Sequence, residues 1–170
     1  MSRQFVTEAV MLAIYGQLLS AAEPVEYIVP YTSFLELYEL QETTDPLMDN
    51  NADDEYVKKK IRELVGYLEE PLNQKKIRRA LLMPWGVSAP ILVGDTTTVT
   101  IVNAVDAAQF GDDFDPIETE LVLTAQRRQL PLLTDQIEWI QRLLEHTIPV
   151  QVYDIEDFEF ALEDPMLHQP

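Results

Sequence analysis

The chain has 170 residues, 46% of them hydrophobic and 25% charged, a balance that is ordinary for one globular domain large enough to bury a core. It contains no cysteine, which excludes disulfides, thiol catalysis and cysteine-ligated zinc or iron–sulfur sites. The formal net charge of −18 opposes long-range attraction to nucleic acid and to anionic membranes.

Histidines and long apolar runs are both scarce. His146 and His168 are the only histidines, which argues against a histidine-rich metal site and against a Ser-His-Asp triad. No run reaches the roughly 18 apolar residues of a membrane span. Polar residues interrupt the apolar N-terminal segment "AVMLAIYGQLL", so a secretory signal is not expected. We therefore expect a soluble, cytoplasmic protein.

The first half of the chain alternates short apolar strands with helices. "QFVT" at 4–7 predicts a strand that leads into a helix ending near Leu19. "VEYIV" at 25–29 predicts a second strand, which is followed by the helix "SFLELYELQ". The acidic stretch at 43–55 lacks periodicity and predicts a loop, and a basic helical segment, interrupted by one proline, follows at 54–83.

Residues 89–110 are open to two interpretations. "ILV" is consistent with a brief strand, whereas "TTTVTIVNAVDAAQF" starts with β-branched residues and ends with a helical pattern. We favour a helix in this second stretch, with Asp95 or Thr96 as its N-terminal cap.

The last third of the chain again alternates helices with short apolar strands. An aspartate followed by a proline predicts a helix start, and this helix extends from 115 to about 128. The strand "LPLLT", a helix at 135–146, the strand "VQVYD" and a helical turn or two at 155–162 complete the pattern. Residues 165–170 are expected to be a tail.

This alternation predicts a single compact α/β domain over 1–164, with a mostly parallel central sheet of about 4–5 short strands and helices on both faces. Right-handed crossovers bring the C-terminal ends of parallel strands to one edge, where such folds bind ligands. Acidic residues lie near the ends of several predicted strands, so they can meet at this edge. The four acids concerned are Glu8, Glu36, Glu118 and Asp135.

Three segments, taken together, resemble the PIN-like nuclease family. "QFVTEAVML" looks like the family's opening strand and acidic residue, and "YIVPYTSFLELYEL" is similar to its second strand and helix. "ETELVLTAQRRQLPLLTDQ" resembles its late helix, strand and aspartate. Glu8 and a second glutamate stand where the family usually has aspartate, and "LLTD" lacks the residue that the family commonly inserts before the aspartate.

The resemblance implies a carboxylate cluster that holds Mg2+ or Mn2+ for the hydrolysis of phosphodiesters, with single-stranded RNA as substrate. On this hypothesis Glu8, Glu118 and Asp135 are metal ligands and Glu36 is a ligand or an anchor behind them. Asp115 replaces Glu118 if the latter points away. The alternative is a PIN-like scaffold that has lost catalysis and binds a partner or a second copy of itself. A small-molecule site at the same edge stays open as well.

Helix capping is a competing interpretation of the same acids. An N-cap residue contributes on the order of 1 kcal/mol, which is enough to account for its residue type. If capping explains them, each carboxyl group folds back onto its own helix. The caps expected on this interpretation are Ser33 with Glu36, Asp115 with Glu118, Asp135 with Glu138, and Thr7 ahead of Glu8.

Basic residues are concentrated in one part of the chain. Eight of the twelve lie between 58 and 79, where there are only three acidic residues. A basic helical face can hold the phosphates of RNA, although a solvated helix face of mixed charge has the same composition. Six of these residues are candidates for substrate binding: Lys58, Lys59, Lys75, Lys76, Arg78 and Arg79.

Overall fold

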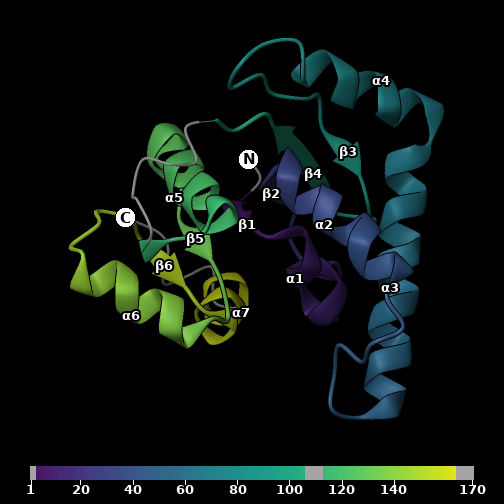
Figure 1. The fold of residues 1–170 in the computed structure, drawn as a ribbon, viewed down its shortest axis with the longest axis horizontal. Coiled ribbons are helices and arrows are strands. Elements are labelled where there is room, and N and C mark those ends of the chain that lie inside the picture. Colours follow the sequence, from purple (N-terminus) through teal and green to yellow (C-terminus); the bar gives the residue numbers. More distant parts are fainter. Residues whose placement is uncertain (1–2, 106–112, 164–170) are drawn as a thin grey trace.

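The structure is a computed structural model that describes residues 3–105 and 113–163 (Figure 1). It has the predicted α/β architecture, built around one mixed but mostly parallel sheet. The described strands are β1 Arg3–Thr7, β2 Val25–Pro30, β3 Ile91–Leu92, β4 Thr97–Val102, β5 Leu132–Leu133 and β6 Val152–Tyr153. The described helices are α1 Ala9–Ile14, η1 Gly16–Leu18, α2 Tyr31–Glu42, α3 Asn51–Glu69, α4 Pro71–Ala80, α5 Pro116–Arg128, α6 Ile137–Glu145 and α7 Ile155–Glu163.

The strand order in the sheet is β3-β4-β2-β1-β5-β6. β3 runs antiparallel to β4, and the other five strands are parallel to one another. The chain builds outward from β1 to β2 and β4, then returns to the other side of β1 for β5 and β6. This reversal of winding lies between β1 and β5, and in open α/β sheets ligands bind beyond the C-terminal ends of the strands at such a point.

Apolar side chains on both faces of the central strands form two cores. Phe5 and Tyr27 point toward a core that α1, α2, α3 and α7 complete. Val6 and Ile28, the next residues along these strands, point to the opposite face, which α5 and α6 cover. Because successive side chains of a strand alternate between faces, a strand buried on both sides reads as a continuous apolar run. The prediction of helices on both faces is therefore confirmed.

The predicted helix within 89–110 is wrong where the structure describes it. Residues 97–102 form β4, which pairs with β2 on one side and with β3 on the other. Thr97 and Thr100 are buried in this strand, and the β-branched sequence "TTTVTIV" suits a pleated strand covered on both faces. Together with the brief strand that "ILV" forms, β4 raises the strand number among the described residues to six, instead of four or five. Residues 106–110 lie outside the described part.

Three predicted boundaries shift. The helix expected to reach Leu19 ends at Ile14, because Tyr15 is extended, with φ −110° and ψ 94°, before the short helix η1. The acidic loop predicted at 43–55 is shorter, since Asn50 accepts hydrogen bonds from the backbone N–H groups of Ala52 and Asp53 and starts α3. The basic segment predicted to end at 83 ends with α4 at Ala80, and a proline at the first position of α4 separates this helix from α3, as expected. None of the helices in the described ranges has the length and hydropathy needed to cross a bilayer.

A tight turn follows α4 at "MPWG". The Gly86 N–H donates to the Met83 carbonyl oxygen at 3.1 Å, and Trp85 between them has a φ of 60°. A Cβ atom on Gly86 would lie 2.0 Å from the backbone oxygen of Ala80, so only glycine fits there. By contrast, a Cβ atom on Gly66, inside α3, would meet nothing within 4 Å.

These two glycines give a matched test of the fold. We expect Gly86→Ala to lower the free energy of unfolding by about 1–3 kcal/mol, because backbone must move to admit the methyl group. Gly66→Ala should raise it by roughly 0.5–1 kcal/mol, because alanine loses less conformational entropy in a helix. Urea denaturation of both variants and the wild type measures the difference, and equal effects of the two substitutions would contradict the turn described here.

Candidate functional site

Glu8 follows the last residue of β1 and is 8% exposed. It occupies the N-cap position of α1, yet its side chain makes no capping hydrogen bond. Its Oε1 atom accepts a hydrogen bond from Nε2 of Gln136 at 3.0 Å. The carboxyl group is thus held at the edge of the sheet without serving the helix that it precedes.

Four more acidic residues surround Glu8. Burial, the largest cause, and the nearby charges of Glu36, Asp115, Asp135 and Glu118 together raise the pKa of Glu8 to about 7. These charges come from three other parts of the chain, namely α2, the start of α5 and the segment after β5, which all approach the end of β1. We call the five residues Glu8, Glu36, Asp115, Glu118 and Asp135 the acidic rim.

Hydrogen bonds from neighbouring side chains hold two members of the acidic rim where the winding reverses. Asp135 follows β5, the strand that pairs with β1, and its Oδ2 atom accepts a hydrogen bond of 2.5 Å from the hydroxyl of Tyr15. Burial and this carboxylate raise the pKa of Tyr15 to about 12, so its hydroxyl stays a donor at neutral pH. Gln136, one residue further, makes the bond to Glu8. The ends of β1 and β5 therefore present two carboxyl groups, each oriented by a neutral donor.

Glu118 differs from the other members of the rim because it forms an ion pair with an arginine side chain. Arg142 on α6 donates from Nη2 to Oε2 at 2.6 Å and from Nη1 to Oε1 at 3.1 Å. Glu118 also accepts from the backbone N–H of Asp115, which caps α5 in return. Glu118 is 6% exposed, so this paired arrangement satisfies a carboxylate that burial would otherwise penalise.

The capping interpretation holds for one of the four predicted caps. Asp115 and Glu118 form the expected capping box. The box predicted for Ser33 and Glu36 is wrong, because α2 begins at Tyr31 and the Ser33 hydroxyl accepts from the backbone N–H of Ala9 at 2.7 Å.

The remaining two predicted caps are wrong as well. α6 begins at Ile137 after Gln136, and no side chain caps it. Thr7 donates its hydroxyl hydrogen to the carbonyl oxygen of Leu133 across the sheet. Capping therefore leaves Glu8, Glu36 and Asp135 unexplained.

The donor atoms at the acidic rim suit a hard cation better than a soft one, because they are carboxylate oxygens. Within 3–105 and 113–163, no group of three or more Asp, Glu or His side chains is arranged as a ready ligand shell. Glu118 is engaged by Arg142. The remaining donors are Glu8 and Asp135, with Glu36 close enough for its charge to act on Glu8. Mg2+ is commonly bound by one or two carboxylates together with waters and substrate phosphates, so this smaller set is chemically sufficient.

The predicted substrate-binding residues lie on α3 and α4. These helices are on the β3–β4 side of the sheet, and α5 and α6 are on the β5–β6 side (Figure 1). Lys58 pairs with Asp54 at 3.0 Å, and Lys76 donates to the carbonyl oxygen of Pro90 at 2.7 Å. The other four are exposed: Lys59, Lys75, Arg78 and Arg79. The structure thus separates most of the basic charge from Asp135, which is on the opposite side of β1.

Sequence reasoning missed the neutral and basic partners of the rim. Tyr15 and Arg142 carry no local motif, and their roles arise only when α1 and α6 meet the sheet edge. A buried glutamate was also missed. Glu120 on α5 accepts a hydrogen bond from the Thr32 hydroxyl, and burial raises its pKa. Its burial has a sequence signal, because it directly precedes the apolar run "LVL" of α5.

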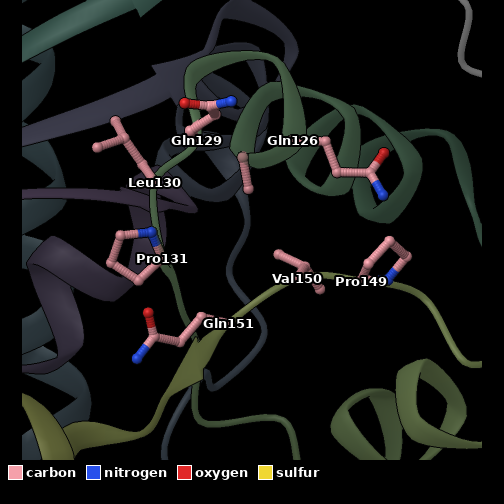
Figure 2. Close-up of a pocket in the computed structure, with 8 residues that line it drawn as sticks. Gln126, Gln129, Leu130, Pro131, Pro149, Val150 and Gln151 are labelled. Atoms are coloured by element: carbon pink, nitrogen blue, oxygen red, sulfur yellow. The ribbon is translucent and has the colours of Figure 1, made fainter.

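An open pocket of about 510 Å3 lies at the opposite end of β5 and β6 (Figure 2). Figure 2 shows side chains from the end of α5 and from the segments that lead into these strands. Its polar groups are the amides of Gln126, Gln129 and Gln151. Because no titratable residue lines it, this pocket offers no acid, base or charged ligand and is not the candidate site.

No protein-family model matches the chain, and comparison with curated proteins gives no relative. The acidic rim is therefore the feature of this chain that indicates a function.

The raised pKa of Glu8 predicts how stability depends on pH. Glu8 has a pKa of about 7 in the folded protein against an ordinary value of 4.5, so the folded state binds the extra proton between these values. The free energy of unfolding should fall as the pH rises from 4.5 to 7. Glu8→Gln should abolish this loss and stabilise the protein at pH 8 by about 2–3 kcal/mol.

Urea denaturation at several values between pH 5 and 8 measures this effect. Glu55→Gln is the control, because Glu55 is exposed on α3 and the substitution changes the net charge equally. A wild-type pH dependence that persists unchanged in Glu8→Gln would show that Glu8 is not the titrating group.

Proposed function

We propose that the acidic rim binds a divalent cation, Mg2+ or Mn2+, and that the protein is a metal-dependent phosphodiester hydrolase of the PIN-like kind that acts on single-stranded RNA. One observation carries the proposal. The carboxyl group of Glu8, which serves no helix cap, is buried at the reversal of winding, near the exposed Asp135, and the charges of four other carboxyl groups act on it.

The charge balance of the rim supports a cation. Five carboxyl groups share this edge, and among the described residues one cation, Arg142, forms an ion pair with them. Burial and the neighbouring like charges raise the cost of ionising Glu8 and Glu36. A divalent cation removes this cost, because it compensates two charges at once. Glu8 and Asp135 would hold it, with Glu36 beside them. When bound, such an ion polarises a phosphate and lowers the pKa of an attacking water.

The other residues of the site position these ligands. Gln136 donates to one oxygen of Glu8 and leaves the second oxygen available. Tyr15 does the same for Asp135. Hydrogen bonds from such partners fix the orientation of ligating carboxylates. The four exposed candidates on α3 and α4 would attract the phosphates of RNA toward an otherwise acidic surface; they are Lys59, Lys75, Arg78 and Arg79.

Calorimetric titration with Mn2+ tests the binding step. We expect saturable binding in the wild type, and its loss in Glu8→Gln and in Asp135→Asn, with Glu55→Gln unchanged as the control. Because Glu8 must lose its proton to bind the ion, the affinity should rise about tenfold per pH unit below pH 7 and level off above it.

Cleavage of a single-stranded RNA oligonucleotide in the presence of Mn2+ tests the catalytic step with the same variants. Wild-type activity that is lost in both rim variants supports the hydrolase. Equal cleavage by the wild type, Glu8→Gln and Asp135→Asn would reject the mechanism.

The ion pair between Arg142 and Glu118 favours a second candidate, a scaffold of the same fold that has lost catalysis and binds a partner or a second copy of itself. On this hypothesis the guanidinium group takes the place of a metal as the counter-charge of the rim. Such a replacement would compensate the negative charge of the rim without a metal ion. The rim would then lack the metal that binds a phosphate.

Arg142→Gln separates the two candidates. The substitution leaves Glu118 unpaired and should lower stability by about 1–2 kcal/mol, less than for a fully buried pair because Arg142 is 37% exposed. If the rim binds metal, Mn2+ restores the melting temperature. If the protein is a scaffold, Mn2+ has no effect on either form. Arg62→Gln on α3 is the control of equal charge. Analytical ultracentrifugation of the wild type then tests self-association.

A further inference from the structure

A second concave site lies away from the acidic rim, between the turn at 83–86, the end of β4 and the C-terminal half of α5. Its volume is about 200 Å3. The two arginines that end α5 border it, and Thr124, one turn earlier, forms part of its wall. The residues that line it are Trp85, Val87, Val102, Thr124, Arg127 and Arg128.

The arginines of this pocket have unmet charge and hydrogen-bonding capacity. Among the described residues, no ion pair includes Arg127 or Arg128, although the chain carries a net charge of −18. The Nε atom of Arg128 is buried and has no hydrogen-bond partner. A buried guanidinium donor without an acceptor is unfavourable, so Arg128 carries an unsatisfied donor beside the pocket.

Trp85 is fixed on the other wall by a strained turn. Its φ of 60° lies in the left-handed region, which bulky residues rarely adopt. The Trp85 N–H donates to the Asn103 carbonyl oxygen at 2.8 Å, and the Asn103 side chain donates to the Met83 carbonyl oxygen at 2.9 Å. The guanidinium carbon of Arg127 lies 4.2 Å from the centre of the Trp85 ring. Strained residues of this kind cluster at ligand sites, and here the turn sets the position of Arg127.

From these contacts we propose that the pocket binds a phosphate group, with Arg127 and Arg128 as its donors. A guanidinium offers two parallel N–H groups that match the oxygens of a phosphate, and two full charges outweigh the partial negative charge at the end of α5. The volume is below the roughly 300–1,000 Å3 of pockets that enclose drug-sized ligands, which favours a small oxyanion. The proposal does not depend on the hydrolase function of the acidic rim.

The phosphate belongs either to the free ion or to the backbone of a nucleic acid, and one titration separates these sources. The protein carries Glu8→Gln and is kept in EDTA, so that the rim and its metals contribute nothing. Inorganic phosphate and a single-stranded oligonucleotide are added separately at constant ionic strength, with chloride as the reference. Tryptophan fluorescence reports binding, because Trp139 is fully buried whereas Trp85 touches Arg127.

We expect a saturable fluorescence change with inorganic phosphate, with the oligonucleotide, or with both. Arg128→Gln and Arg127→Gln should each weaken that binding about tenfold or more. Arg128→Lys keeps the charge and should still weaken it, because lysine lacks the Nε donor and the planar fork. Arg62→Gln, with the same loss of charge, should leave it unchanged.

Two results would overturn the proposal. One is a fluorescence signal that shows no saturation with either probe. The other is an equal weakening by Arg62→Gln and Arg128→Gln, because binding would then reflect net charge and no defined pocket. Failure of Mn2+ binding at the acidic rim has no bearing on these measurements, so the two proposals fail independently.

Discussion

The crowding of carboxyl groups around Glu8 depends on the reversal of winding between β1 and β5. If all later strands lay on the β2 side of β1, the end of β1 would have only β2 and a covering helix as neighbours. Because β5 instead joins β1 from the other side, Asp135 arrives beside Glu8, and α5 brings Asp115 and Glu118 to the same edge. The topology thus concentrates negative charge, and hydrogen bonds from Gln136 and Tyr15 and the pairing of Arg142 with Glu118 make this concentration compatible with a folded protein.

Arg142 divides the rim into two parts with different chemistry. On the α5 side, its guanidinium is bound to Glu118 and its Nη1 atom also donates to the backbone oxygen of Asp113, so the carboxylate of Glu118 already has a counter-charge. On the β1–β5 side, Glu8 and Asp135 have only neutral donors. A bound cation would therefore lie toward the second part. Arg142 is therefore consistent with both proposed functions. A metal could bind beside it, at Glu8 and Asp135, or its own charge could replace that of a metal in a scaffold.

Much of the fold could be predicted from the sequence, because β1, β2, β5 and β6 are short apolar runs followed by helices. The sequence predicts a helix in place of β4. A strand buried on both faces lacks the alternation of polar and apolar residues, and a helical pattern follows "TTTVTIV" directly. The gathering of acids at one edge was one of two interpretations of the sequence, because parallel order permits it and helix capping accounts for the same residue types. Their partners were not predicted, because Tyr15 and Arg142 reach the rim through the packing of separate helices, which leaves no periodic trace in the sequence.

The two edges of the sheet have a consequence for how this protein can associate. Among the described residues, both outer strands, β3 and β6, are only two residues long. Strands this short offer a neighbouring chain few free backbone groups, so joining of sheets edge to edge is disfavoured. The strong negative charge opposes such contact further. Association of copies through helical surfaces would avoid both obstacles.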